Sequence, residues 1–305
     1  MFSNIYKQSI CHYNMNCNLC KSDNIRHIGI FRGFNLFRCA KCKLTFSILD
    51  KELDSKKLYE KDYFEKLHPE FFSECTGSLS NNEKTKIYRE HLDEIIKIKK
   101  FGKLLDIGCG SGNFLNEARK YGFDVYGVDV SSYVIEKANK IYKLKNLKQG
   151  KLNKGTFKKD FFDVITMNDV IEHVDDPSSI LRLANSFLKK DGILLVYTIN
   201  ESSLLYKVAN YLHKLSFGMI KKPIELCYPV HHLFYFRDYN LKIYLKNNGF
   251  EPFYSKKHNM PLSANTSGGF IKTSILYIFY KLSEVTKSQF EIVYLSKKIS
   301  EPYER

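Results

Sequence analysis

The stretch LLDIGCGSGNF, from Leu104 to Phe114, decides the fold class of this 305-residue chain. It starts as an apolar strand that ends near Asp106, and it continues through Gly108, Gly110 and Gly112 into the start of a helix. Glycine lets the backbone turn tightly and approach a bound molecule where any Cβ atom would collide. The N-terminus of the following helix favours a negatively charged group. The stretch therefore predicts a strand–turn–helix unit that holds a ligand.

Downstream of Phe101, apolar strands alternate with amphipathic helices, which is the pattern of a parallel sheet with crossover helices. Helices are expected between successive strands, and Asp176 with Pro177 should start one that runs to about Lys189. After Asn200 the alternation weakens, with helices near 202–215 and 238–248. The expected strands lie near 103–107, 123–129, 146–150, 162–168, 192–198, 251–256 and 290–297.

The glycine turn does not fit a nicotinamide-binding GxGxxG motif, because Asn113 follows the last of its alternating glycines. Three features instead resemble the class I S-adenosylmethionine (SAM)-dependent methyltransferases: D-x-G-x-G-x-G from Asp106, the acid Asp129 in YGVDVS, and FFDVITMNDVIEHVDDP from Phe161. The resemblance is strongest over about residues 101–200. It implies a Rossmann-like α/β fold with a seven-stranded sheet, helices on both faces and an antiparallel last strand.

The same resemblance implies SAM as the cofactor and assigns roles to single residues. Gly108 and Gly110 would line the methionine moiety, and Asp106 would hold the loop and the cofactor's amino group. Asp129 would bind the ribose. Members of the family often carry an acid near the adenine after the third strand, but this chain reads QGKLNKG there, so backbone and apolar contacts are expected instead. The full expected set is Asp106, Gly108, Gly110, Asp129, Val130, Leu152 and Asn168, the last at the sulfonium end.

Two CxxC pairs, Cys17 with Cys20 and Cys39 with Cys42, are separated by eighteen residues, a spacing typical of zinc sites. Four thiolates close a tetrahedral shell and leave no open position for catalysis, so we predict a structural zinc ion. Thiols without metal are the alternative. Lysines follow the second cysteine of each pair where glycine is common, which predicts slightly strained turns. This ribbon, with LYEKDYFEK after it, resembles that of bacterial and archaeal methyltransferases, many associated with surface glycans or small metabolites.

These patterns divide the chain into three parts. A zinc ribbon with an N-terminal tail is expected over 1–50, a helical linker over 51–100, and a methyltransferase domain over 101–305 with substrate-cap elements after residue 200. The sequence has no signal-peptide pattern and no run of eighteen apolar residues. We therefore expect a cytoplasmic location, in which thiols stay reduced.

Methyl transfer from a sulfonium requires alignment of the acceptor and often removal of its proton. We expect His232 or His173 to act as the base, although a lone histidine is more often a packing residue. Glu172 beside His173 resembles ubiquinone-biosynthesis O-methyltransferases, in which a divalent ion can organise a catechol. One acid and one histidine are too few ligands to require a metal.

The net charge of +15 comes mainly from lysine and is most concentrated after residue 181. Lysine-rich composition can reflect an AT-rich genome or a preference for anionic partners. Nucleic acid is a less favoured partner, because there are only eight arginines and arginine is the residue favoured for recognising phosphates and bases. In addition, the chain reads MNDV after the fourth expected strand, where enzymes that methylate base amines have an NPPY-like motif.

We expect the acceptor to be a hydroxyl of a small sugar-bearing or acidic molecule, such as a glycan, nucleotide sugar or lipid-linked precursor. The alternatives are a zinc-ribbon RNA methyltransferase, a quinone-type O-methyltransferase and a non-catalytic cofactor-binding subunit. FIKTSILYIFYKLSEV, from Phe270, is expected to pack against the sheet, with peripheral membrane contact or covering of the pocket as alternatives.

Overall fold

The computed structural model describes residues 15–31, 34–48, 83–229, 231–260 and 269–300. Most of the expected linker, residues 51–82, lies outside these ranges. The described remainder of that segment begins with helix α3 (Glu83–Ile96), which agrees with the helical period of its sequence.

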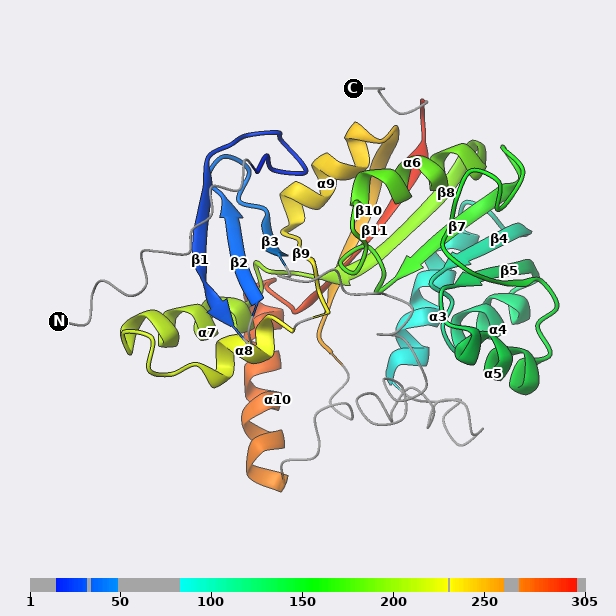
Figure 1. The fold of residues 1–305 in the computed structure, drawn as a ribbon. Coiled ribbons are helices and arrows are strands. Elements are labelled where there is room, and N and C mark those ends of the chain that lie inside the picture. Colours follow the sequence, from blue (N-terminus) through cyan, green and yellow to red (C-terminus); the bar gives the residue numbers. More distant parts are fainter. Residues whose placement is uncertain (1–14, 32–33, 49–82, 230, 261–268, 301–305) are drawn as a thin grey trace.

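A seven-stranded sheet with the order β10-β11-β8-β7-β4-β5-β6 forms the centre of the molecule (Figure 1). β11 runs antiparallel to both β8 and β10, while the pairs among β8, β7, β4, β5 and β6 are parallel. This confirms the expected seven-stranded sheet with a reversed last strand. The strands are β4 (Gly102–Ile107), β5 (Phe123–Asp129), β6 (Leu147–Gln149), β7 (Phe162–Asn168), β8 (Leu188–Ile199), β10 (Phe250–His258) and β11 (Glu291–Lys298).

Helices cover both faces of the sheet, as expected. Alternate strand residues point to opposite faces, so Leu104 packs in one core and Leu105 in the other. α3, α4 (Asn113–Lys120) and α5 (Ser132–Tyr142) supply the first core. α6 (Pro177–Phe187) and α9 (Asp238–Asn247) supply the second.

Two local expectations are wrong. No helix connects β6 to β7, because the crossover from Gly150 to Phe161 lacks a helical apolar period and its turn is instead closed by the Asn153 and Thr156 side chains. Furthermore, α6 ends at Phe187 rather than near Lys189, because β8 begins at Leu188. The predicted cap is correct, since the Ser178 amide donates to Asp176 Oδ1 over 3.0 Å.

The N-terminal cysteine-containing segment, residues 15–31 and 34–48, forms a small antiparallel sheet that we call the cysteine ribbon. It contains β1 (Ile25–Phe31), β2 (Phe34–Cys39) and β3 (Thr45–Ile48). Its fourth strand, β9 (Phe234–Tyr235), comes from the region after the main sheet's parallel strands. Apolar side chains of the ribbon lie in the same core as α6 and α9, so the ribbon packs directly on the main α/β fold.

The remaining elements lie beside the ribbon and below the sheet in Figure 1: α7 (Leu204–Leu215), α8 (Lys222–Cys227) and α10 (Gly269–Val285). α10 projects away from the sheet, so the expectation that it packs against the sheet is wrong. Among its described side chains, Tyr280 and Ser283 are buried, whereas Tyr277, Ile278 and Leu282 are exposed. Within the described ranges, no helix combines the length and apolar character needed to cross a membrane.

Candidate active site

The glycine loop after β4 is fixed against the end of β5. The amides of Gly108 and Cys109 donate to the Val128 carbonyl over 2.7 and 3.1 Å. Gly108 has φ 70°, and a Cβ atom there would lie 2.4 Å from Val170 Cγ2. Because an L side chain would be both strained and in collision, this position requires glycine. The loop thus exposes backbone where the resemblance places the methionine moiety.

Asp129, at the end of β5, organises both the loop and the next helix. Its Oδ2 accepts from the Gly110 amide over 3.0 Å, and its Oδ1 accepts from the Ser131 amide over 2.9 Å. Each carboxylate oxygen retains a second lone pair, which a ribose hydroxyl could use. Burial raises the pKa of Asp129 despite these amide bonds.

Asp106 lies at the centre of a buried polar group below the loop. Its Oδ1 accepts from Thr166 Oγ1 over 2.7 Å and from Asn168 Nδ2 over 3.1 Å. Burial raises its pKa to about 7. Asn168 Oδ1 is buried and has no hydrogen-bond partner in the described structure. An acidic group beside an unpartnered acceptor suits the amino group of the expected cofactor. Thr166 was missed in the sequence, although it lies on the same face of β7 as Asn168.

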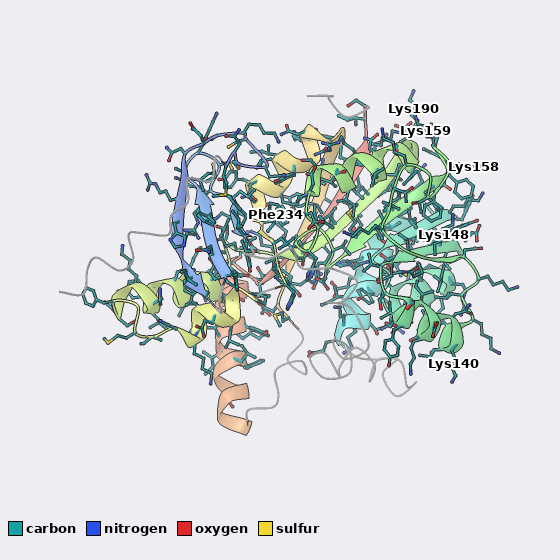
Figure 2. The ribbon with its side chains drawn as sticks, viewed as in Figure 1. Lys140, Lys148, Lys158, Lys159, Lys190 and Phe234 are labelled. Carbon is teal, nitrogen blue, oxygen red and sulfur yellow. The ribbon has the colours of Figure 1, made fainter. Side chains whose placement is uncertain are left out.

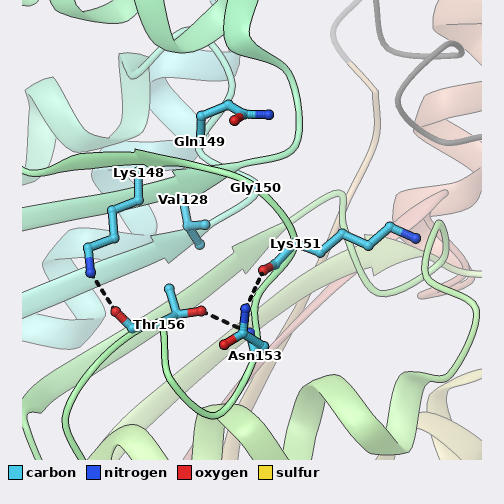
Figure 3. A pocket seen from close by; sticks show the side chains of 7 residues that line it. All are labelled: Val128, Lys148, Gln149, Gly150, Lys151, Asn153 and Thr156. Carbon is cyan, nitrogen blue, oxygen red and sulfur yellow. Dashed lines mark hydrogen bonds between the residues drawn. The ribbon is translucent and has the colours of Figure 1, made fainter.

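The expected adenine side lies beyond β6. Gln149 Nε2 donates to the Val130 carbonyl over 3.0 Å, and the Gly150 amide donates to the Asp129 carbonyl over 2.7 Å. A cavity of about 440 Å³ adjoins this segment (Figure 3). Leu152 does not line it but packs, partly buried, against the core. The cavity is lined by Val128, Lys148, Gln149, Gly150, Lys151, Asn153 and Thr156.

The structure brings His173 and His232 together although they are far apart in the sequence. Their ring centroids are 4.6 Å apart, and ligand atoms of Glu172, His173 and His232 all lie within 4.8 Å of one another. His231, which sequence reasoning missed, has its ring centroid 4.7 Å from that of His232. The turn that carries Glu172 and His173 starts directly after Asn168, so this cluster adjoins the glycine loop through Val170.

Glu172 is the buried acid of this histidine cluster, with 1% of its surface exposed. Burial, reinforced by the nearby Asp169 carboxylate, raises the pKa of Glu172 to about 8. The same two causes raise the pKa of Glu291 to about 8, and the Tyr197 hydroxyl donates to that carboxylate. A carboxyl group such as that of Glu172, with a pKa near neutrality and imidazoles beside it, is typical of sites that exchange protons or bind cations.

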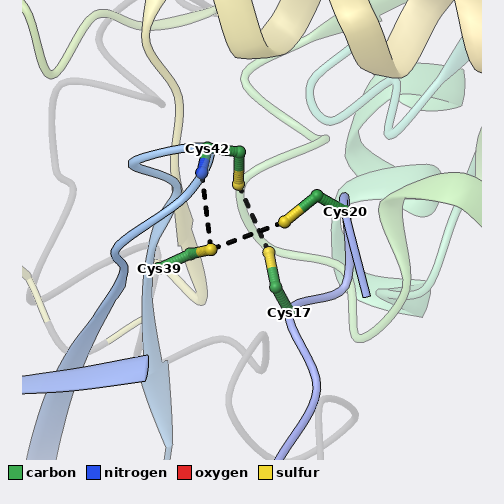
Figure 4. Close-up of side chains that lie close together, drawn as sticks. All are labelled: Cys17, Cys20, Cys39 and Cys42. Carbon is green, nitrogen blue, oxygen red and sulfur yellow. Dashed lines mark hydrogen bonds between the residues drawn. The ribbon is translucent and has the colours of Figure 1, made fainter. Parts of the chain in front are cut away.

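The four ribbon cysteines form a compact cluster (Figure 4). Cys17 Sγ lies 3.4 Å from Cys42 Sγ, and Cys20 Sγ lies 3.5 Å from Cys39 Sγ. Sulfur atoms around a tetrahedral zinc ion are about 3.8 Å apart, because each Zn–S bond is about 2.3 Å long. The donor set and its size therefore fit such an ion. The turns that follow contain Lys21 at φ 59° and Lys43 at φ 58°, a left-handed backbone that agrees with the expectation of slightly strained turns.

Several lysines of the α/β fold lie away from the histidine cluster. Figure 2 shows Lys140, Lys148, Lys158, Lys159 and Lys190 along the right side of the view, whereas Phe234, the first residue of β9, lies near the centre. The net charge alone therefore does not indicate an acidic acceptor at that cluster.

Fold and site together define a class I methyltransferase architecture. Residues 81–254 match a family profile described as a methyltransferase domain. This match spans more than half of the chain, and the chain belongs to this family of SAM-dependent methyltransferases.

Several similar curated proteins carry the name of an O-methyltransferase. A ubiquinone biosynthesis O-methyltransferase from Actinobacillus pleuropneumoniae serotype 7 is 32% identical over 146 residues, covering 41% of this chain and 62% of that protein. The Pelagibacter ubique protein of the same name is 36% identical over 110 residues, covering 35% and 46%. The chain thus spans about half to three fifths of the length of these relatives.

Solved structures support the fold. A Pyrococcus horikoshii OT3 protein superposes with a TM-score of 0.52 at 20% identity, covering 78% of this chain and 99% of its own. A Thermotoga maritima protein described as a SAM-dependent methyltransferase, possible histamine N-methyltransferase, gives 0.50 at 20% identity, covering 78% and 97%. At this identity the likeness concerns the fold alone.

The affinity for SAM is expected to rise as the pH increases from about 5.5 to about 8. In the free enzyme the pKa of Asp106 is raised to about 7, so at lower pH the carboxyl must lose a proton before it can pair with the cofactor's ammonium group. Each pH unit below this pKa should weaken binding by up to about tenfold. Calorimetry across this range checks the slope. Asp106→Asn should bind weakly with a flat profile, and a wild-type profile without slope would contradict the role of Asp106.

Proposed function

We propose that this enzyme transfers the methyl group of SAM to a hydroxyl of a small ring-bearing molecule. The observation that carries the proposal is the histidine cluster beside the cofactor loop, where two imidazoles and a buried acid face one another. A hydroxyl must lose its proton as it attacks the methyl group, and imidazole accepts a proton near neutral pH. SAM supplies the electrophilic methyl group, and the chain's residues orient the acceptor.

His232 is the proposed base and His173 its positioning partner. His173 Nδ1 lies 2.9 Å from the His231 carbonyl oxygen, which orients the His173 ring toward His232. Glu172, buried in the same cluster, can hold a proton or a negative charge near neutral pH. This arrangement supports removal of one acceptor proton with little rearrangement of the protein.

A bound divalent cation is the second way to activate the hydroxyl. Glu172, His173 and His232 would be its ligands, because their donor atoms lie within 4.8 Å of one another and carboxylate and imidazole are suitable donors. Such an ion would lower the pKa of the acceptor hydroxyl. The name of the curated relatives supports a quinone-type ring hydroxyl, and a sugar hydroxyl is the other acceptor to be tested.

Transfer of labelled methyl groups from SAM into fractionated cell extract tests the proposed function. We expect label in small-molecule and lipid fractions, in an ether linkage that survives mild alkali. Label in RNA would show that the acceptor is RNA and not a small molecule. Tight SAM binding without any transfer would instead favour a non-catalytic, cofactor-binding subunit. Adding EDTA to the productive fraction separates metal-assisted from histidine-only activation.

We further propose that the cysteine cluster holds zinc in a reducing, cytoplasmic environment. The purified protein is expected to contain about one zinc per chain, because four thiolates complete one tetrahedral shell. Metal analysis by mass spectrometry, with thiol titration before and after denaturation, measures this. The Cys39→Ser variant should lose the metal. Cys227→Ser should keep it, because Cys227 is a buried residue of α8 outside the cysteine cluster. Four titratable thiols without metal would refute the zinc site.

A membrane surface is the proposed peripheral partner. The turn between α7 and α8 presents Phe217, 94% exposed, and Met219, 80% exposed, at the edge of the molecule away from the sheet (Figure 1). Lys214, Lys221 and Lys222 flank these side chains. Apolar side chains within a basic border suit an anionic lipid surface.

Sedimentation with phosphatidylglycerol-containing vesicles is expected to pull down the wild-type protein. Phe217→Ser with Met219→Ser should abolish most of this binding, because the inserted apolar area is lost. Phe101→Ser is the matched control, since Phe101 is 76% exposed but lies directly before β4, outside the turn between α7 and α8. Equal binding of all three proteins, or binding to neutral phosphatidylcholine alone, would contradict the proposal.

A further inference from the structure

The segment from His231 to Leu233, which we call the histidine segment, lies between the cysteine ribbon and the turn after β7. On the ribbon side, Ser47 of β3 holds it with two hydrogen bonds. The Ser47 amide donates to the Leu233 carbonyl over 2.9 Å, and Ser47 Oγ donates to the His232 carbonyl over 2.9 Å. β9 then continues the segment as a strand paired with β3.

On its other side, the histidine segment is bound to the turn that carries Glu172 and His173. The amides of Leu233 and Phe234 both donate to the Glu172 carbonyl, over 2.7 and 3.1 Å. The ring of His173 adds its contact to the His231 carbonyl. The distance between His232 and His173 is therefore set by two anchors, of which one belongs to the ribbon.

The buried carboxylate of Glu201 holds the ribbon next to the histidine segment. The Glu201 side chain is 1% exposed, and its Oε1 accepts from Arg38 and Thr45 of the ribbon, each over 2.6 Å. The same carboxylate accepts from Tyr228 over 2.9 Å and from Arg237 over 2.9 Å. Because these last two residues lie before and after the histidine segment, Glu201 joins both ends of that segment to β2 and β3.

The cysteine turns themselves contact the catalytic fold. The Tyr239 hydroxyl donates to the Cys42 carbonyl, and the Tyr244 hydroxyl donates to Asn18 Oδ1 over 2.7 Å. Both tyrosines belong to α9, the helix that follows β9. Cys17, Cys39 and Cys42 also lie in the apolar core shared with α6 and α9. The cysteine cluster therefore contacts the histidine segment indirectly on both sides, through β3 and through α9.

We infer that the cysteine ribbon positions His232 for methyl transfer, with Ser47 as the positioning residue. This inference rests on the proposed function of His232. The ribbon makes none of the hydrogen bonds described for the glycine loop, Asp106 or Asp129. It therefore acts on the transfer step and leaves SAM binding unchanged.

Variants at Ser47 test the inference in the full-length, metal-containing protein. Ser47→Ala removes one hydrogen bond and should lower kcat by about 5- to 10-fold. Ser47→Pro removes both, because proline has no amide hydrogen, and should lower kcat by about 100-fold through misplacement of the base. Ser47→Thr restores the hydroxyl and should recover most of the activity. The assay measures labelled methyl transfer into the most active extract fraction, and calorimetry measures the Kd for SAM.

His27→Ala is the matched control, because it removes a 3.0 Å hydrogen bond to Asn35 within the ribbon without touching the histidine segment. Its kcat should stay at the wild-type value. For every Ser47 variant the Kd for SAM should stay within about twofold. A second readout is the set of imidazole NMR signals from His173, His231 and His232, which should shift in Ser47→Pro and not in His27→Ala.

The outcomes distinguish this inference from the proposed function. Full turnover and unchanged imidazole signals in Ser47→Pro, with loss of turnover in His232→Ala, would overturn the positioning role and leave the base assigned. Full turnover in His232→Ala would overturn the base itself. Parallel weakening of SAM binding and turnover in the Ser47 variants would show a general structural defect and would also overturn the inference.

Discussion

Replacing His232 with alanine is expected to lower the kcat of methyl transfer by about 100-fold or more, the usual size of general-base catalysis. The Kd for SAM should be unchanged, because His232 takes part in none of the hydrogen bonds described for the glycine loop, Asp106 or Asp129. The loss should therefore appear in kcat with intact cofactor binding. Single-turnover transfer with labelled SAM, together with calorimetry, separates the two quantities.

Two controls make the result specific. His213→Ala removes a histidine of α7 whose Nδ1 lies 3.1 Å from the Ile220 carbonyl oxygen, and this variant should retain full turnover. Added imidazole should restore part of the activity of His232→Ala, because a free base can occupy the space left by the side chain. Wild-type turnover in His232→Ala would exclude this residue as the base.

Replacing Gly108 with alanine is expected to weaken SAM binding by about 100-fold. The new Cβ atom would lie 2.4 Å from Val170 Cγ2 in a backbone with φ 70°. Either the loop or the turn after Asn168 must then move, and each holds part of the expected cofactor site. Left-handed strain in a non-glycine residue alone costs about 1–3 kcal/mol. Isothermal calorimetry of the purified variant measures the change.

The collision and the strain can be separated. Gly108→Ala combined with Val170→Ala should recover part of the affinity, since the shorter side chain removes the colliding methyl group. Gly122→Ala tests strain without collision, because Gly122 has φ 90° but no atom within 4 Å of its Cβ position; it should bind SAM normally. If Gly108→Ala binds SAM as well as wild type, the loop does not hold the cofactor as proposed.

The sequence by itself determined the features that depend on neighbouring residues. Alternating glycines after an apolar strand predict a tight turn, because the backbone freedom of glycine does not depend on distant residues. The 2-residue and 3.6-residue periods similarly identified the sheet and its covering helices. Asp106, Asp129 and Asn168 were named from the resemblance of their motifs to class I methyltransferases. The structure places them at the carboxyl ends of β4, β5 and β7, which parallel strands bring to one edge of the sheet.

Short-range errors arose where local preference was weak. Leu188 could extend a helix or begin a strand, and its pairing with Phe162 of β7 selects the strand. The crossover after β6 alternates glycine, asparagine and lysine, and its lack of a helix follows from side-chain bonds within the turn. Apolar residues in α10 predicted packing against the sheet, yet only one side of its described part is covered.

Only the tertiary structure decided how the distant segments meet. His232 reaches His173 because β9 pairs with β3 of the ribbon, and that pairing depends on main-chain groups that carry no sequence signature. Glu201 looks like an ordinary surface acid in the sequence, but its burial among Arg38, Thr45, Tyr228 and Arg237 makes it the junction of ribbon and cap. Local motifs thus indicate the cofactor, through their resemblance to a family, and the cysteine cluster. Long-range pairing assembles the histidine cluster, because contacts between distant residues form only when the whole chain packs.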